Sequence, residues 1–95
     1  MALPGALVAL IEATHVFSAG VSYPVRLVSV QPAPPPPHEP HTLMITVETR
    51  HRGAVYRAEC VVAASDISDY RRVVERIAGC VGAALGQPGR SNYGA

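Results

Sequence analysis

Hydrophobic and polar side chains alternate along two stretches near the middle of the chain, on either side of a short turn. Leu43 starts the first stretch and Tyr56 the second, and in each the residues suited to a core fall at every second position. Alternation with a period of two over this length is typical of strands with one buried face. The pattern therefore predicts a long β-hairpin over about 42–64.

The charges of the hairpin favour one register. A two-residue loop, Arg52-Gly53, sets Glu48 opposite Arg57 on the solvent face, whereas a three-residue loop would bury charged side chains. Glycine suits the positive φ of a type I′ turn, but arginine is a poor first residue for it, so a four-residue loop with the same pairing stays open. The pairs expected on the buried face are Leu43–Val62, Ile45–Cys60, Val47–Ala58 and Thr49–Tyr56.

An amphipathic helix is predicted directly after the hairpin, over about 66–85. Its apolar residues recur at helical spacing and form a stripe that faces a core. Ser65 or Asp66 is expected to cap its start, and Gly86 followed by Pro88 to end it. The stripe consists of Tyr70, Val73, Val74, Ile77, Val81, Ala84 and Leu85, and the arginines that lie away from it are Arg71, Arg72 and Arg76.

Gly79 and Gly82 lie inside this predicted helix. Each costs about 1 kcal/mol of stability relative to alanine. The cost indicates close approach of another backbone, either within the fold or across a subunit contact. The alternative is sequence drift on an exposed helix face.

The first third of the chain predicts a short buried helix over about 4–14 and a strand over 21–30. Pro24 cannot donate to a ladder, so the strand is expected at a sheet edge or to begin near this residue. Val28 and Val30 fall on the face opposite to Tyr23, which indicates a bulge or a strand that a partner covers on both sides.

Two further segments have biased compositions. Residues 31–41 are proline-rich and predict an extended polyproline connection, which is either a stiff linker or a docking ligand, and which could reach a neighbouring subunit. Residues 87–95 are rich in Gly, Ser and Asn and are expected to be a flexible tail, which leaves one domain over 1–86. The prolines singled out in the first segment are Pro34, Pro35, Pro36 and Pro37.

Composition bounds the function of this 95-residue chain. With 48% hydrophobic residues and a net charge of +1, it does not match a strong electrostatic binder of nucleic acid. The apolar run near the start is too short to span a membrane, and it lacks the basic residues of a signal peptide. We expect an α+β fold with a short N-terminal helix, a small antiparallel sheet built on the hairpin and a C-terminal helix packed on one sheet face.

Candidate chemistry is sparse. His38 and His41 flank a carboxylate, but two histidines on a loop are a weak metal signal, and no cysteine pattern supports zinc. Cys60 and Cys80 could approach each other if the helix packs over the hairpin, and a reduced pair of core thiols is expected. We therefore expect no catalytic residue, no metal and no cofactor, and a role in binding or assembly rather than an enzyme.

Three short motifs carry a family resemblance: the apolar run 6–11, the Tyr-Pro-Val-Arg-Leu sequence at 23–27, and the late strand at 56–64, which leads into a helix ending in Ala-Ala-Leu before Gly86. In these motifs and in the order of elements, the chain resembles the tail-terminator and tail-completion proteins of long-tailed bacteriophages. The resemblance implies an oligomeric ring, often hexameric, that caps the tail tube and joins it to the head. The partners implied are further copies of the chain and neighbouring virion proteins, and the location is the virion, or the host cytoplasm during assembly.

Under this hypothesis, subunit contacts are expected from the early strand, the proline-rich loop and the exposed helix face. The alternative is a small adaptor or inhibitor module that docks on another protein through the proline-rich loop or a sheet edge. The expected contact residues are Val28, Val30, Pro34 to Pro37, Arg71, Arg72, Arg76, Gly79 and Gly82.

Overall fold

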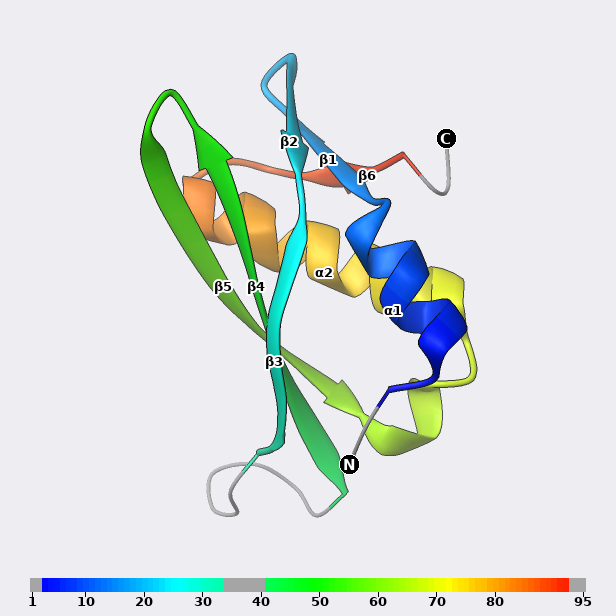
Figure 1. Ribbon diagram of the computed structural model, residues 1–95. Coiled ribbons are helices and arrows are strands. Elements are labelled where there is room, and N and C mark those ends of the chain that lie inside the picture. Colours follow the sequence, from blue (N-terminus) through cyan, green and yellow to red (C-terminus); the bar gives the residue numbers. More distant parts are fainter. Residues whose placement is uncertain (1–2, 34–40, 93–95) are drawn as a thin grey trace.

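The computed structural model describes residues 3–33 and 41–92, and it has the expected α+β architecture (Figure 1). In chain order, the elements are α1 (Gly5–Glu12), β1 (His15–Ser18), β2 (Val21–Pro24), β3 (Arg26–Pro32), β4 (Thr42–His51), β5 (Ala54–Ala63), the 3₁₀ turn η1 (Ala64–Asp66), α2 (Tyr70–Leu85) and β6 (Arg90–Ser91). The prolines Pro34 to Pro37 and His38 lie outside the described residues.

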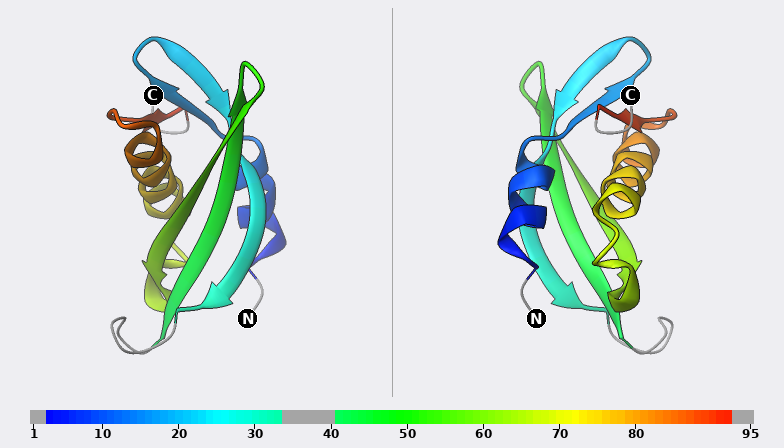
Figure 2. Two further views of the ribbon diagram at one scale, coloured as in Figure 1. Left: turned by 90° about the vertical axis from the view of Figure 1, so that its left-hand side faces the viewer. Right: turned by 90° about the vertical axis from the view of Figure 1, so that its right-hand side faces the viewer.

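The strands form two antiparallel sheets, with the orders β3-β4-β5 and β2-β1-β6. Both helices lie on the same side of β3-β4-β5, with α1 against β3 and α2 against β5 (Figure 2). The other face of this sheet is not covered by any element of the described residues. The predicted packing of the C-terminal helix on one sheet face is therefore confirmed.

The core lies between β3-β4-β5 and the two helices. Leu7 and Ile11 of α1 are fully buried, as are Ile45 of β4 and Val73 and Ile77 of α2. Burying a side chain of this size stabilises the fold by roughly 1.5–3 kcal/mol, so this cluster supplies much of the driving force for folding.

The register predicted for the hairpin is confirmed at every pair, from Leu43 opposite Val62 to Thr49 opposite Tyr56. The loop has two residues, Arg52 and Gly53, with φ of 51° and 82°. Both angles are positive, as a type I′ turn requires, so the four-residue alternative does not apply.

The N-terminal region differs from the prediction. The helix ends at Glu12 rather than near residue 14, and the next residues form β1, a strand that the pattern did not predict. Ala19 and Gly20 turn the chain with φ of 50° and 79°, and β2 then pairs back on β1. A strand of four residues is too short to show a clear alternation, which is why it was missed.

The single strand predicted over 21–30 is two strands that belong to different sheets. The chain leaves one sheet after Pro24 and enters the other at Arg26. A register shift between Leu27 and Ser29 confirms the bulge that was one of the two expected alternatives. The extra residue restores Val30 to the core face, opposite Ile45, so its placement on the outer face was wrong.

α2 begins later than predicted. The chain first forms η1, and Asp69 then caps α2 by accepting a hydrogen bond from the Arg72 backbone N–H at 3.1 Å. Neither Ser65 nor Asp66 is the cap. At the other end Gly86 adopts φ of 78° and ends the helix as expected.

The segment after α2 belongs to the fold and is not a tail from residue 87 onward. It turns back across the helix, and β6 pairs with β1. A Cβ atom placed on Gly82 would overlap the backbone N of Gly89 and lie 2.7 Å from the Gln87 carbonyl oxygen. The close approach that Gly82 permits is therefore within the chain, and this buried residue is not a subunit contact. Residues 93–95 lie outside the described residues.

Candidate interaction surface

Among residues 3–33 and 41–92, the two outer strands of β3-β4-β5 each have one edge without a neighbouring strand. β4 is the central strand, and β3 and β5 each pair with it alone. An open edge presents backbone N–H and C=O groups in a row, which is a template for another strand. At these two edges, backbone groups as well as side chains can therefore contact a partner.

The turn determines which β5 groups point outward. In a two-residue hairpin, the residues that flank the turn form a hydrogen-bonded pair, and every second residue after them does the same. Ala54 flanks the turn here. The backbone groups of Val55, Arg57, Glu59 and Val61 therefore point away from β4, and we call these four residues the β5 edge.

One contact confirms this direction. The Arg76 side chain donates from Nε to the Val61 carbonyl oxygen at 3.1 Å, across the outer side of β5. Within residues 3–33 and 41–92, the outward backbone groups of Val55, Arg57 and Glu59 have no hydrogen-bond partner. The β5 edge is thus open over most of its length and closed by Arg76 at one end.

The side chains of the β5 edge lie on the uncovered sheet face. Val55 is 49% exposed, and Arg57 and Glu59 are also exposed. The Arg57 Nε atom lies 3.5 Å from Oε2 of Glu48, the cross-strand pair predicted from the sequence. Arg26 Nη1 lies 3.9 Å from the other oxygen of Glu48, so a row of alternating charge crosses the sheet.

The β3 edge carries the bulge. Val28 is the inserted residue and is 40% exposed, so it is available for a contact, as expected from the sequence. Val30 packs against the core instead. Bulges are one way in which proteins disfavour strand addition, and the uninterrupted β5 edge is therefore the better template.

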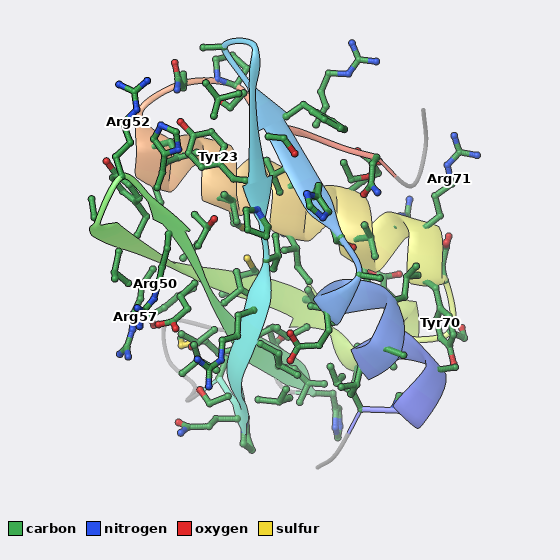
Figure 3. The ribbon with its side chains drawn as sticks, turned by 45° about the horizontal axis from the view of Figure 1, so that its top comes forward. Tyr23, Arg50, Arg52, Arg57, Tyr70 and Arg71 are labelled. Carbon is green, nitrogen blue, oxygen red and sulfur yellow. The ribbon has the colours of Figure 1, made fainter. Side chains whose placement is uncertain are left out.

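The three arginines of α2 separate into two groups. Arg72 Nη1 lies 3.4 Å from Asp66 Oδ1, and Arg72 and Arg76 both line a polar pocket of about 350 Å³ beside the end of β5. Arg71 is exposed and lies on the side of the molecule opposite to Arg57 (Figure 3). The structure therefore brings Arg72 and Arg76, but not Arg71, close to the β5 edge.

Comparisons with protein families, curated proteins and solved structures found no match to this chain. The resemblance to phage tail proteins therefore stays a prediction from the sequence.

The two cysteines meet between β5 and α2. Cys60 is fully buried, Cys80 is half-buried, and both are free thiols. A hydrogen bond between the thiols, together with burial, raises the pKa of Cys60. The same hydrogen bond lowers the pKa of Cys80 to about 7, with help from the Arg76 guanidinium. Their approach, one of the possibilities drawn from the sequence, is confirmed.

We also considered a small-molecule pocket, a metal site and a membrane-spanning helix. A shallow pocket of about 200 Å³ lies where β2 passes into β3, beside Thr49, whose Oγ1 atom is buried without a hydrogen-bond partner in the described structure. Among the residues described, no group of three or more His, Cys, Asp or Glu side chains could hold a metal ion. None of the helices in that part of the chain has the length and apolar character needed to cross a membrane.

Sequence reasoning did not single out the β5 edge. The alternation of side chains predicts the cross-strand pair of Arg57 with Glu48, but it does not by itself give the direction of the β5 backbone groups. The signal was nevertheless present, because the Arg52-Gly53 turn fixes which residues of the following strand bond with β4.

Proposed function

We propose that this protein is a non-catalytic assembly subunit that associates with further copies of itself through the open edges of β3-β4-β5. The observation that carries the proposal is the β5 edge, where a ten-residue strand presents unpaired backbone groups beside an exposed valine. Pairing with another strand satisfies such groups and removes the risk of uncontrolled aggregation.

The arrangement of the molecule supports this role. Both helices lie on one side of the sheet, so the face that carries the side chains of Val55, Arg57 and Glu59 is free of helices in the described residues (Figure 2). In the part of the chain that the structure describes, this sheet has two open edges, and a subunit that joins a closed assembly needs surfaces of this kind. The setting at the end of a phage tail, with neighbouring virion proteins as further partners, rests on the sequence resemblance alone.

Light scattering across a concentration series tests the proposal. The chain has a mass of 10.0 kDa, and we expect discrete multiples of this value that become more populated as concentration rises. Glu59→Pro removes an outward N–H from the β5 edge without removing a bond to β4, and should shift the protein toward monomer. A monomer at every concentration would contradict self-association and favour a docking module for another protein.

A further inference from the structure

We infer that the β5 edge pairs antiparallel with the β5 edge of a second copy, around a twofold axis at Ala58. The inference rests on the proposed function, since it specifies which surface self-associates and in which register. A contact of this kind is isologous, so the same residues serve both copies.

The backbone groups fit this arrangement. A twofold axis at Ala58 sets Arg57 opposite Glu59 of the second copy, and Val55 opposite Val61 of the second copy. All of these residues point their backbone N–H and C=O groups outward, so each pair exchanges both N–H···O bonds. The Val61 carbonyl oxygen already accepts from Arg76, and its second lone pair remains for the new strand.

The charges select this register over its neighbours. At Ala58 the axis produces two Arg57–Glu59 pairs, flanked on each side by a Val55–Val61 pair. A shift to an axis at residue 57 sets Arg57 against Arg57, and a shift to residue 59 sets Glu59 against Glu59. Like charges directly opposite each other destabilise strand pairing, whereas opposite charges stabilise it. The four side chains of the β5 edge are therefore self-complementary in one register.

The side of α2 that borders the β5 edge carries two large or polar side chains followed by small ones. Arg76 marks this side, because it reaches the Val61 carbonyl, and Cys80 follows one turn later against Cys60. Residues three and four positions apart share a helix side, so it continues with Ala83 and Ala84, which are exposed. Small side chains here offer little obstruction along the stretch where Arg57 and Glu59 pair.

A charge-exchange experiment tests the inference. Glu59→Arg gives an edge with arginine at both central positions, and Arg57→Glu gives an edge with glutamate at both. We expect each variant alone to dimerise at least roughly tenfold more weakly than the wild type, because both symmetric contacts become repulsive. An equimolar mixture of the two variants should form heterodimers, since every central contact is then between opposite charges. Sedimentation equilibrium measures all three samples.

Two controls separate charge at the edge from general effects. Glu12→Arg makes the same exchange at an exposed residue of α1 and should leave the mass unchanged. The double variant Arg57→Glu/Glu59→Arg restores opposite charges and should dimerise again, even though it loses the Arg57–Glu48 ion pair.

The outcomes distinguish the two claims. If the wild type forms oligomers and both single variants form them equally well, the Ala58 register is wrong while self-association stands. If the wild type stays monomeric at all concentrations, the proposed function fails and the inference fails with it. If the mixture does not associate although the wild type does, opposite charge at these positions is not what selects the register.

Discussion

Gly79 and Gly82 lie less than one turn apart in α2 and have opposite environments. Gly82 faces the returning chain, and a Cβ atom there would overlap backbone atoms of Gly89. Gly79 is exposed, with nothing within 4 Å of the position that its Cβ would take. Packing within one copy therefore explains Gly82. It gives no reason for Gly79, which lowers the stability of the helix relative to alanine. Gly79 remains a proposed contact residue.

Alanine at these two positions should have effects of opposite sign. Gly82→Ala is expected to destabilise the fold by about 1–3 kcal/mol, because backbone must move to admit the methyl group. Gly79→Ala should stabilise the helix by about 1 kcal/mol. Urea denaturation at low protein concentration measures both changes, and destabilisation by Gly79→Ala would show that its surroundings have been misjudged.

The thiol of Cys80 gives a prediction that depends on pH. Alkylation by iodoacetamide follows the thiolate fraction, so its rate should rise with a midpoint near pH 7. Cys60→Ala removes the hydrogen bond that contributes most to the lowered pKa, and the midpoint should then move to higher pH. An unchanged midpoint in this variant would show that the hydrogen bond from Cys60 does not lower the pKa.

Among the elements, the strands and register of the hairpin could be predicted from the sequence, with its loop length left open, whereas the small sheet could not. Ten-residue strands offer enough alternating positions for one register to be clearly better than the others, and the Glu48–Arg57 pair adds to the choice. β1 and β6 have four and two residues, and they pair across most of the length of the chain. Such short segments carry no periodicity. Tertiary contacts place β6 beside β1, among them the close packing of Gly82 and Gly89 and the hydrogen bond from Ser18 Oγ to the Pro88 carbonyl oxygen.

The predicted contact residues also fall into two groups, those that lie at the surface near a sheet edge and those that do not. Val28, which is exposed on β3, and Arg76, which donates to the Val61 carbonyl oxygen of β5, are both residues that the sequence indicated as contacts. Val30 lies on the core face because the bulge at Val28 shifts the alternation by one residue. The sequence indicated a bulge as one of two alternatives but gave no means of choosing between them. Arg71 lies apart from Arg72 and Arg76, since successive helix residues point in directions about 100° apart.

The hairpin turn offers a stabilising substitution. Arg52 adopts φ of 51°, a region that side chains other than Asn, Asp and Gly adopt at a cost. Arg52→Asn gives the Asn-Gly sequence preferred in type I′ turns and should raise stability by about 0.5–1 kcal/mol. Thermal unfolding provides the measurement. A lower melting temperature would mean that the arginine side chain makes a contribution that the turn geometry does not reveal.

At the scale of the whole molecule, the two sheet edges differ in what they can support. The β5 edge is self-complementary and closes into a pair, whereas the bulged β3 edge and the exposed Val28 remain for a different contact. An assembly that used both would join dimers through a second interface, so a hexamer would be a trimer of dimers. Such a hexamer has two equivalent faces because of its twofold axes, so it differs from the ring between tail tube and head that the phage resemblance implies, whose two faces meet different partners.

Amide hydrogen exchange, measured at low and high protein concentration, shows whether the β5 edge pairs with another strand when the protein self-associates. Exchange at an exposed edge is fast, and a new backbone hydrogen bond slows it. We expect the amides of Arg57 and Glu59 to exchange rapidly in dilute protein and to become protected as concentration rises, while the amide of Ala58, which already bonds with β4, stays protected throughout. Rapid exchange at Arg57 and Glu59 in a sample that is oligomeric by mass would contradict the β5 edge as the interface.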